Sequence, residues 1–167
     1  MGRSTKFSLM AFIIKAFSSA LNHYPKINSH YYEEKPFEYV QYRDHNLTIA
    51  IDSAHGLAVP NIKACQEKSI AEISEEISRL RALANEGKLG SNDLLDGTVT
   101  LSNVGNIGGT YVGPVVLPPQ IMIVGMGGIQ TVPRYLHKDY TKTFPRSIVN
   151  KIYADCDCGS LGSCVCV

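Results

Sequence analysis

The chain has 167 residues, of which 44% are hydrophobic and 19% are charged, and its formal net charge at pH 7 is +1. This length fits one domain with a sizeable core, and the composition is that of an ordered globular protein. The near-neutral charge gives no reason to expect nucleic acid as a partner. No apolar run is long enough to span a bilayer, so we expect no membrane segment.

The first third of the chain predicts one helix and then short strands. Apolar residues dominate Phe7 to Leu21, which predicts a largely buried helix that Pro25 closes. Strand patterns follow at residues 28–32, 37–42 and 46–51, and the first two predict a hairpin. In the third, apolar and polar residues alternate, which predicts a strand with one buried face.

A second helix is predicted with both of its ends. Ser69 and Glu72 have the spacing of a capping box, and Gly87 is a typical residue to end a helix. Apolar residues between these positions form one stripe. The charged residues, Arg81 among them, are expected to face solvent.

A strand that runs into a glycine-rich loop follows. The turn Asp96-Gly97 precedes the strand pattern Thr98 to Ser102, and three glycines follow between residues 105 and 109. Ser102 and Asn103 lie where strand gives way to loop, a position that suits polar groups facing a bound molecule. The alternative is a plain strand followed by a turn.

Two further strands are predicted toward the C-terminus. Ile121 to Met126 is a nearly continuous apolar run, which is typical of a central strand, and residues 145–153 predict one more strand. Strands and two helices together indicate the α+β class, with a mixed sheet and helices on one of its faces.

Four of the five cysteines lie near the C-terminus, at Cys156, Cys158, Cys164 and Cys166. Two Cys-x-Cys pairs offer metal ligands, but they lack the Cys-x-x-Cys spacing of zinc knuckles. We therefore expect no metal site and keep a metal-binding tail as an alternative.

Several stretches together resemble the catalytic domain of the 2-oxoacid dehydrogenase acyltransferases, most closely the branched-chain lipoamide type. The resemblance covers about residues 3–150. It is carried by residues 6–16 and 45–52, Gly56-Leu57 with Val59-Pro60-Asn61, residues 97–110, and Pro118-Pro119.

The resemblance implies a two-layer α/β sandwich like that of chloramphenicol acetyltransferase. It also implies acyl transfer between dihydrolipoamide and coenzyme A, in which a histidine is the general base and a serine stabilises the oxyanion. By its place in the motif that serine is Ser102. The resemblance further places Arg3, Ser18, Asp52, Ser102, Asn103, Gly127 and Ile129 along the coenzyme A channel.

The same resemblance implies the partners and the location. The lipoyl group is carried on another domain, and other subunits of a 2-oxoacid dehydrogenase complex are expected to bind. The intact family domain is expected to be a homotrimer in the mitochondrial matrix. From the sequence we expect no transit peptide within these residues.

The family's Asp-His-Arg-x-x-Asp-Gly motif is missing. After Ala154-Asp155, Cys156 stands in the place of the histidine, and no histidine follows His137. We therefore divide the chain into a truncated acyltransferase domain, residues 1–153, and a divergent cysteine-rich tail, residues 154–167. Alternative splicing, a frameshift or an error of gene prediction would produce such a tail.

The expected consequence is an acyltransferase that is inactive for lack of its base. Two alternatives stay open: a non-catalytic fragment that binds coenzyme A or joins an assembly, and a metal-binding protein acting through its tail.

Overall fold

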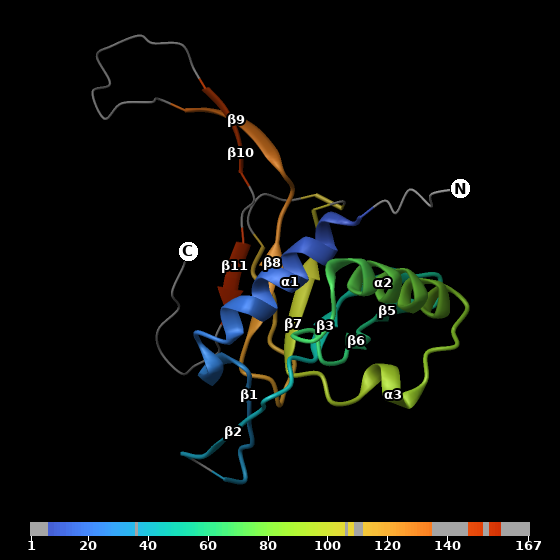
Figure 1. The fold of residues 1–167 in the computed structure, drawn as a ribbon, viewed down its shortest axis with the longest axis vertical. Helices are drawn as coiled ribbons and strands as arrows, with labels where there is room; N and C mark the ends of the chain where they lie inside the picture. The colour runs from blue at the N-terminus through green and yellow to red at the C-terminus, as the bar shows by residue number, and fades with distance from the viewer. Residues whose placement is uncertain are drawn as a thin grey trace.

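A mixed five-stranded sheet forms the centre of the molecule (Figure 1). The computed structural model describes residues 7–35, 37–105, 107–108, 112–134, 147–151 and 154–157. The strand order is β11-β8-β7-β3-β6, with β3, β7 and β8 parallel and the two outer strands antiparallel to their neighbours. These strands are β3 (Leu47–Ile49), β6 (Asn61–Ile62), β7 (Val99–Asn103), β8 (Ile123–Met126) and β11 (Ala154–Asp157).

Two long helices, α1 (Leu9–Leu21) and α2 (Ile70–Asn85), pack on one face of this sheet. The core joins Ile14 of α1 and Ile73 of α2 to alternate strand residues such as Leu47 and Leu101. A 3₁₀ turn (Pro25–Ile27) and the short α3 (Ser91–Leu94) complete the helical elements of the described residues. The α+β class with a mixed sheet is therefore confirmed.

Helix α1 forms where the sequence predicts a helix, but its burial differs from the prediction. Ser8 is the N-cap, and its side chain accepts a hydrogen bond from the backbone N–H of Met10. The expectation of a largely buried helix is wrong, because Leu9 is 51% and Phe12 46% exposed. One side of α1 faces the sheet and α2, and among the described residues Leu9 and Phe12 stay about half exposed on the other side.

Helix α2 has both predicted ends. Ser69 Oγ accepts from Glu72 N at 3.2 Å, and Glu72 Oε2 accepts from Ser69 N at 2.7 Å, which completes the capping box. At the other end Gly87 has φ 66°, and Lys88 N donates to Leu83 O, as in a Schellman motif.

The two hairpins lie outside the main sheet. β1 (Ser29–Tyr31) pairs with β2 (Tyr39–Gln41), as predicted. The strand expected at 46–51 is divided: β3 stays in the sheet, whereas β4 (Ile51–Ser53) turns away to pair with β5 (Gly56–Ala58). The expected single buried face is also wrong, since Thr48 is buried beneath Gln120 on the side opposite the helices.

The C-terminal strands extend the fold beyond the expected boundary at residue 153. β9 (Gln130–Arg134) and β10 (Ser147–Lys151) form a separate antiparallel pair that projects from the main sheet in Figure 1. β10 confirms a strand within 145–153. β11, which was not predicted, lies beside β8, so residues 154–157 belong to the sheet. Residues 158–167 of the expected tail lie outside the described residues.

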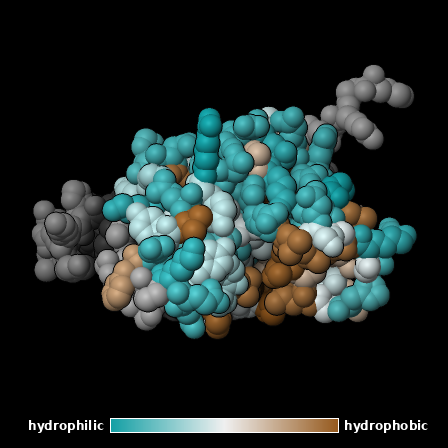
Figure 2. All heavy atoms as spheres, turned by 90° about the horizontal axis from the view of Figure 1, so that it is seen from below, coloured by the Kyte–Doolittle hydropathy of each residue, from teal (hydrophilic) through white to brown (hydrophobic). Residues whose placement is uncertain are grey.

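Figure 2 shows the end of the molecule that carries β1, β2 and α3. This surface is mostly hydrophilic, apart from one hydrophobic patch to the right of the centre. Within the described ranges, no helix is long and apolar enough to cross a membrane.

Candidate functional site

A cavity of about 640 Å³ lies at the carboxyl ends of the three parallel strands. Residues that follow β3, β7 and β8 form one side, and α1 and α2 form the other. Ligands of open sheets with parallel strands commonly bind at this edge, because the loops that leave the strands converge there. The apolar walls include Met10, Ile13, Ile49, Ile77 and Met126, and the polar lining includes Ser8, Asp52, Arg81 and Asn103.

Four of the seven residues expected along the coenzyme A channel line this cavity. They are Asp52, Asn103, Gly127 and Ile129. Arg3 lies outside the described residues. Ser18 and Ser102 are described but are not part of the cavity wall.

Ser102 occupies the face of β7 that looks away from the helices. Neighbouring residues of a strand point to opposite faces, and Leu101 lies fully buried in the core beneath α1 and α2. Asn103 follows on the same face as Leu101 and reaches the cavity. The half-buried Ser102 hydroxyl is thus adjacent in sequence to the cavity wall but lies on the other face of the sheet.

The loops after β7 and β8 touch through their backbones. Asn103 Oδ1 accepts a hydrogen bond from Gly105 N at 3.0 Å, which closes the turn after β7. A Cβ on Gly105 would lie 2.8 Å from the carbonyl oxygen of Gly127. Glycine at position 105 is therefore required for the close approach that brings Asn103 and Gly127 to the same cavity.

Ser18 has a different environment from the one the resemblance implies. It is 1% exposed, and its Oγ lies 2.9 Å from Nδ1 of His45, which is 5% exposed. Burial lowers the pKa of His45, with a further lowering from Lys15, while Asp44 and Ser18 act in the opposite direction. The Ser18–His45 pair joins α1 to the start of β3.

Arg81 is a cavity residue that the sequence reading missed. The helical pattern places it among the solvent-facing charges of α2, and it is indeed exposed, yet it also lines the cavity. The available signal was its position one turn after Ile77, a buried residue that lines the same cavity. Arg81 and Asp52 give the cavity one positive and one negative group.

Neither a histidine nor a metal cluster is present at the described part of the site. The cavity wall contains no histidine within the described ranges, and those residues include no group of three or more potential metal ligands. Cys65 is buried, which raises the pKa of its thiol to about 11. Cys158, Cys164 and Cys166 lie outside the described residues, so a metal-binding tail stays a prediction.

Comparison with known proteins identifies the family. The family model for the catalytic domain of 2-oxoacid dehydrogenase acyltransferases matches residues 1–152. The mitochondrial lipoamide acyltransferase component of the branched-chain alpha-keto acid dehydrogenase complex of Caenorhabditis elegans is 47% identical over 133 residues, which is 80% of this chain and 30% of that protein. The chain thus spans about 30% of the length of the curated relatives it matches.

Solved structures agree in fold. A probable dihydrolipoamide acetyltransferase from Listeria monocytogenes is 31% identical with a TM-score of 0.77, and the alignment covers 90% of this chain and 60% of that one. A truncated catalytic core of the 2-oxoacid dehydrogenase multienzyme complex from Thermoplasma acidophilum is 35% identical with a TM-score of 0.73, over 78% and 60% of the two chains. The chain therefore belongs to the family of 2-oxoacid dehydrogenase acyltransferase catalytic domains.

Proposed function

We propose that this chain is the acyltransferase core of a mitochondrial 2-oxoacid dehydrogenase complex and carries acyl groups between dihydrolipoamide and coenzyme A. The observation that carries the proposal is the cavity at the ends of β3, β7 and β8, in a domain whose family performs this chemistry. Branched acyl groups are the preferred substrates by similarity to the branched-chain relatives.

The cavity has the size and lining that part of coenzyme A requires. Its volume of about 640 Å³ falls within the range typical of small-molecule sites. Apolar walls suit the pantetheine arm, and Asp52 and Asn103 offer oxygen acceptors to its amide N–H groups. Arg81 offers a guanidinium to a phosphate.

Chemically, the step needs an activated thiol and a stabilised oxyanion. Attack of a thiolate on the thioester carbonyl forms the new carbon–sulfur bond and a tetrahedral oxyanion. When this intermediate collapses, the original carbon–sulfur bond breaks and the thiolate that carried the acyl group leaves. The Ser102 hydroxyl donates to that oxyanion. Because Ser102 faces away from the cavity, we infer that the thioester lies at the tip of β7, beyond Asn103.

The general base is what this chain lacks. A thiol is a weak nucleophile until a base removes its proton. The sequence resemblance would put Cys156 at the family's histidine position, so we propose that transfer is slow. A non-catalytic role in binding coenzyme A or in assembly is the second candidate, and it is favoured by the same replacement.

We further propose that the intact domain has the chloramphenicol acetyltransferase architecture and forms a homotrimer that receives a lipoyl-bearing domain. Apolar side chains at the cavity mouth support a surface that a partner covers, since Ile107 is 77% and Ile129 54% exposed.

Binding of coenzyme A, measured by isothermal titration calorimetry, tests the site without requiring turnover. We expect Arg81→Gln to weaken binding about tenfold, because a hydrogen bond to a charged group is lost. Lys88→Gln is the matched control: Lys88 is an exposed cation just beyond the end of α2 that pairs with Glu86 and is not part of the cavity wall. Absence of binding at millimolar coenzyme A would refute the proposed site.

A further inference from the structure

The face of the sheet opposite the helices carries a buried polar network. Thr48 of β3 and Thr100 of β7 are neighbours in register and are 3% and 1% exposed. Buried hydroxyl groups need hydrogen-bond partners. Gln120, from the segment that leads into β8, supplies them for both threonines.

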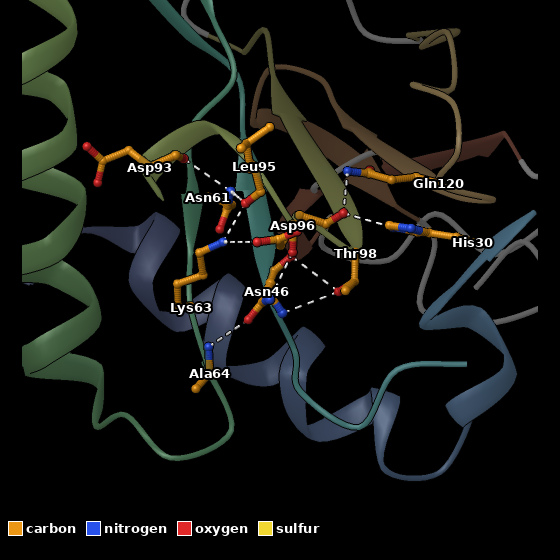
Figure 3. A network of polar contacts seen from close by, with 11 residues as sticks. His30, Asn46, Asn61, Lys63, Ala64, Asp93, Leu95, Asp96, Thr98 and Gln120 are labelled. Atoms are coloured by element: carbon orange, nitrogen blue, oxygen red, sulfur yellow. Dashed lines mark hydrogen bonds and ion pairs between the residues drawn. The ribbon is translucent and has the colours of Figure 1, made fainter. Parts of the chain in front are cut away.

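Gln120 joins three segments through one amide group. Its Oε1 accepts a hydrogen bond from Thr100 Oγ1 at 2.5 Å, and its Nε2 lies 3.3 Å from Thr48 Oγ1 and 3.1 Å from the carbonyl oxygen of Gly97. His30 Nε2 lies 2.9 Å from the same carbonyl oxygen. Figure 3 shows His30 and Gln120 both directed at this backbone oxygen before β7.

The network leaves no room for a side chain on Gly97, because a Cβ there would overlap Thr48 Oγ1. Each of the two nitrogen donors occupies one lone pair of the Gly97 carbonyl. The beginning of β7 is therefore fixed to the β1–β2 hairpin and to the segment before β8 at one point.

The side-chain bond of Thr100 is also shorter than the backbone bond beside it. Thr100 N donates to Met122 O at 3.4 Å, a long contact, whereas Thr100 Oγ1 and Gln120 Oε1 are 2.5 Å apart. Ser102 lies two residues further along β7 on the same face, about 6.6 Å away along the strand. Beside the backbone ladder that pairs Ser102 with Gly125, the side-chain hydrogen bond Thr100–Gln120 is the nearest one on the Ser102 face of β7 among the described residues.

We propose that Gln120 is a positioning residue for Ser102. Through its hydrogen bond with Thr100 it fixes the position and direction of β7, and therefore the position of the Ser102 hydroxyl. This inference rests on the proposed role of Ser102 in acyl transfer.

The test compares two isosteric substitutions, one in β7 and one at the residue that directly precedes it. Thr100→Val removes the hydroxyl that Gln120 holds. Thr98→Val is the matched control: Thr98 is 1% exposed and lies on the same face, but its hydroxyl bonds the backbone of Asn46. Hydrogen–deuterium exchange of the Ser102 and Asn103 amides is measured by NMR for each full-length variant and normalised to the change at β3 amides.

We expect Thr100→Val to accelerate normalised exchange at Ser102 and Asn103 about tenfold, the factor that corresponds to one lost hydrogen bond. Thr98→Val should leave it unchanged, and Thr100→Ser, which keeps the hydroxyl, should restore wild-type exchange. In the acyl-transfer assay, kcat should fall for Thr100→Val while the KM for coenzyme A is retained.

Equal acceleration in both valine variants, or acceleration spread evenly over all strands, would show that the network only stabilises the fold and would overturn the inference. A wild-type chain that neither binds coenzyme A nor transfers acyl groups would instead overturn the proposed function. In that case the exchange comparison still decides whether the network holds the Ser102 end of β7.

Discussion

Ser102 lies at the end of β7, where the strand alternation turns its hydroxyl away from the apolar core and toward the side that carries Thr100 and Gln120. Asn103, the next residue, reaches the cavity. Ser102 and Asn103 therefore face two different surfaces, because successive side chains of a strand point to opposite faces of the sheet.

The first prediction concerns the general base that we propose this chain lacks. We expect the chain to transfer acyl groups about 10² to 10⁴-fold more slowly than a full-length relative, which is the usual contribution of general base catalysis. Restoring an Asp-His-Arg-x-x-Asp-Gly ending should recover activity. In that repaired chain Ser102→Ala should reduce kcat about 10² to 10³-fold. The assay is turnover of isobutyryl-coenzyme A with dihydrolipoamide, and a wild-type rate near that of a relative would contradict the prediction.

The buried His45 makes stability dependent on pH. Its pKa in the folded protein is lowered from the ordinary value of 6.5, so the unfolded chain binds a proton more readily. The stability that the neutral, buried His45 contributes is fully present above pH 6.5. It is lost as the pH falls from 6.5 through the lowered pKa of His45 in the folded protein. His30, whose pKa is also lowered, principally by burial, acts in the same direction.

Urea unfolding between pH 8 and pH 5 measures this dependence. We expect His45→Gln to flatten part of the slope of unfolding free energy against pH, with His30 supplying the remainder. His23→Gln, which removes an imidazole at an exposed position, is the control. An unaltered slope in His45→Gln would show that His45 is not the group that titrates.

Among the elements, α2 supports the cavity from one side with Ile77 and Arg81. Its start is held by the reciprocal bonds between Ser69 and Glu72. We expect Ser69→Ala to lower the free energy of unfolding by about 1 kcal/mol, since an N-cap acceptor is removed. Ser78→Ala, at an exposed position inside the same helix, should change it by less than about 0.5 kcal/mol. The denaturant midpoints of the two variants test this prediction. Equal shifts would mean that the Ser69 cap stabilises the helix no more than Ser78 does.

Elements whose signal is local were predictable from the sequence. The capping box, the Gly87 end of α2 and the strand that leads to Ser102 all depend on residues close together in the chain. The strands of the β1–β2 hairpin are also close together in the chain, and the hairpin formed as expected.

Features that depend on distant partners were not predictable. β11 has no periodicity of its own and is a strand because β8 offers an unpaired edge. Arg81 enters the cavity because α2 lies beside the loops after β3 and β7, which a helical pattern cannot show. Ser18 faces His45 for the same reason: the pairing of α1 with the start of β3 is tertiary.

For the molecule as a whole, the exposed apolar side chains are the main concern. Phe7, Leu9 and Phe12 are each about half exposed, and Val115 is 80% exposed. Apolar side chains left uncovered favour association, since full burial of such a side chain from full exposure is worth about 1.5 to 3 kcal/mol. We expect the isolated chain to be poorly soluble or partly molten, and not to form a defined trimer.

Analytical ultracentrifugation with a thermal melt tests this expectation. A broad distribution of sedimentation coefficients is the expected result. A single sharp trimer that melts cooperatively would contradict the expectation.

The parallel pairing of β3 with β7 also determines when the sheet can form. Leu47 meets Val99 only after the intervening chain, which contains all of α2, has folded back on itself. Closing so long a loop is entropically unfavourable, whereas α2 makes local contacts and can form first. Each newly made chain therefore passes through a period in which β3 and β7 are not yet paired. The cavity does not exist during that period, so coenzyme A cannot assist folding until the slowest pairing is complete.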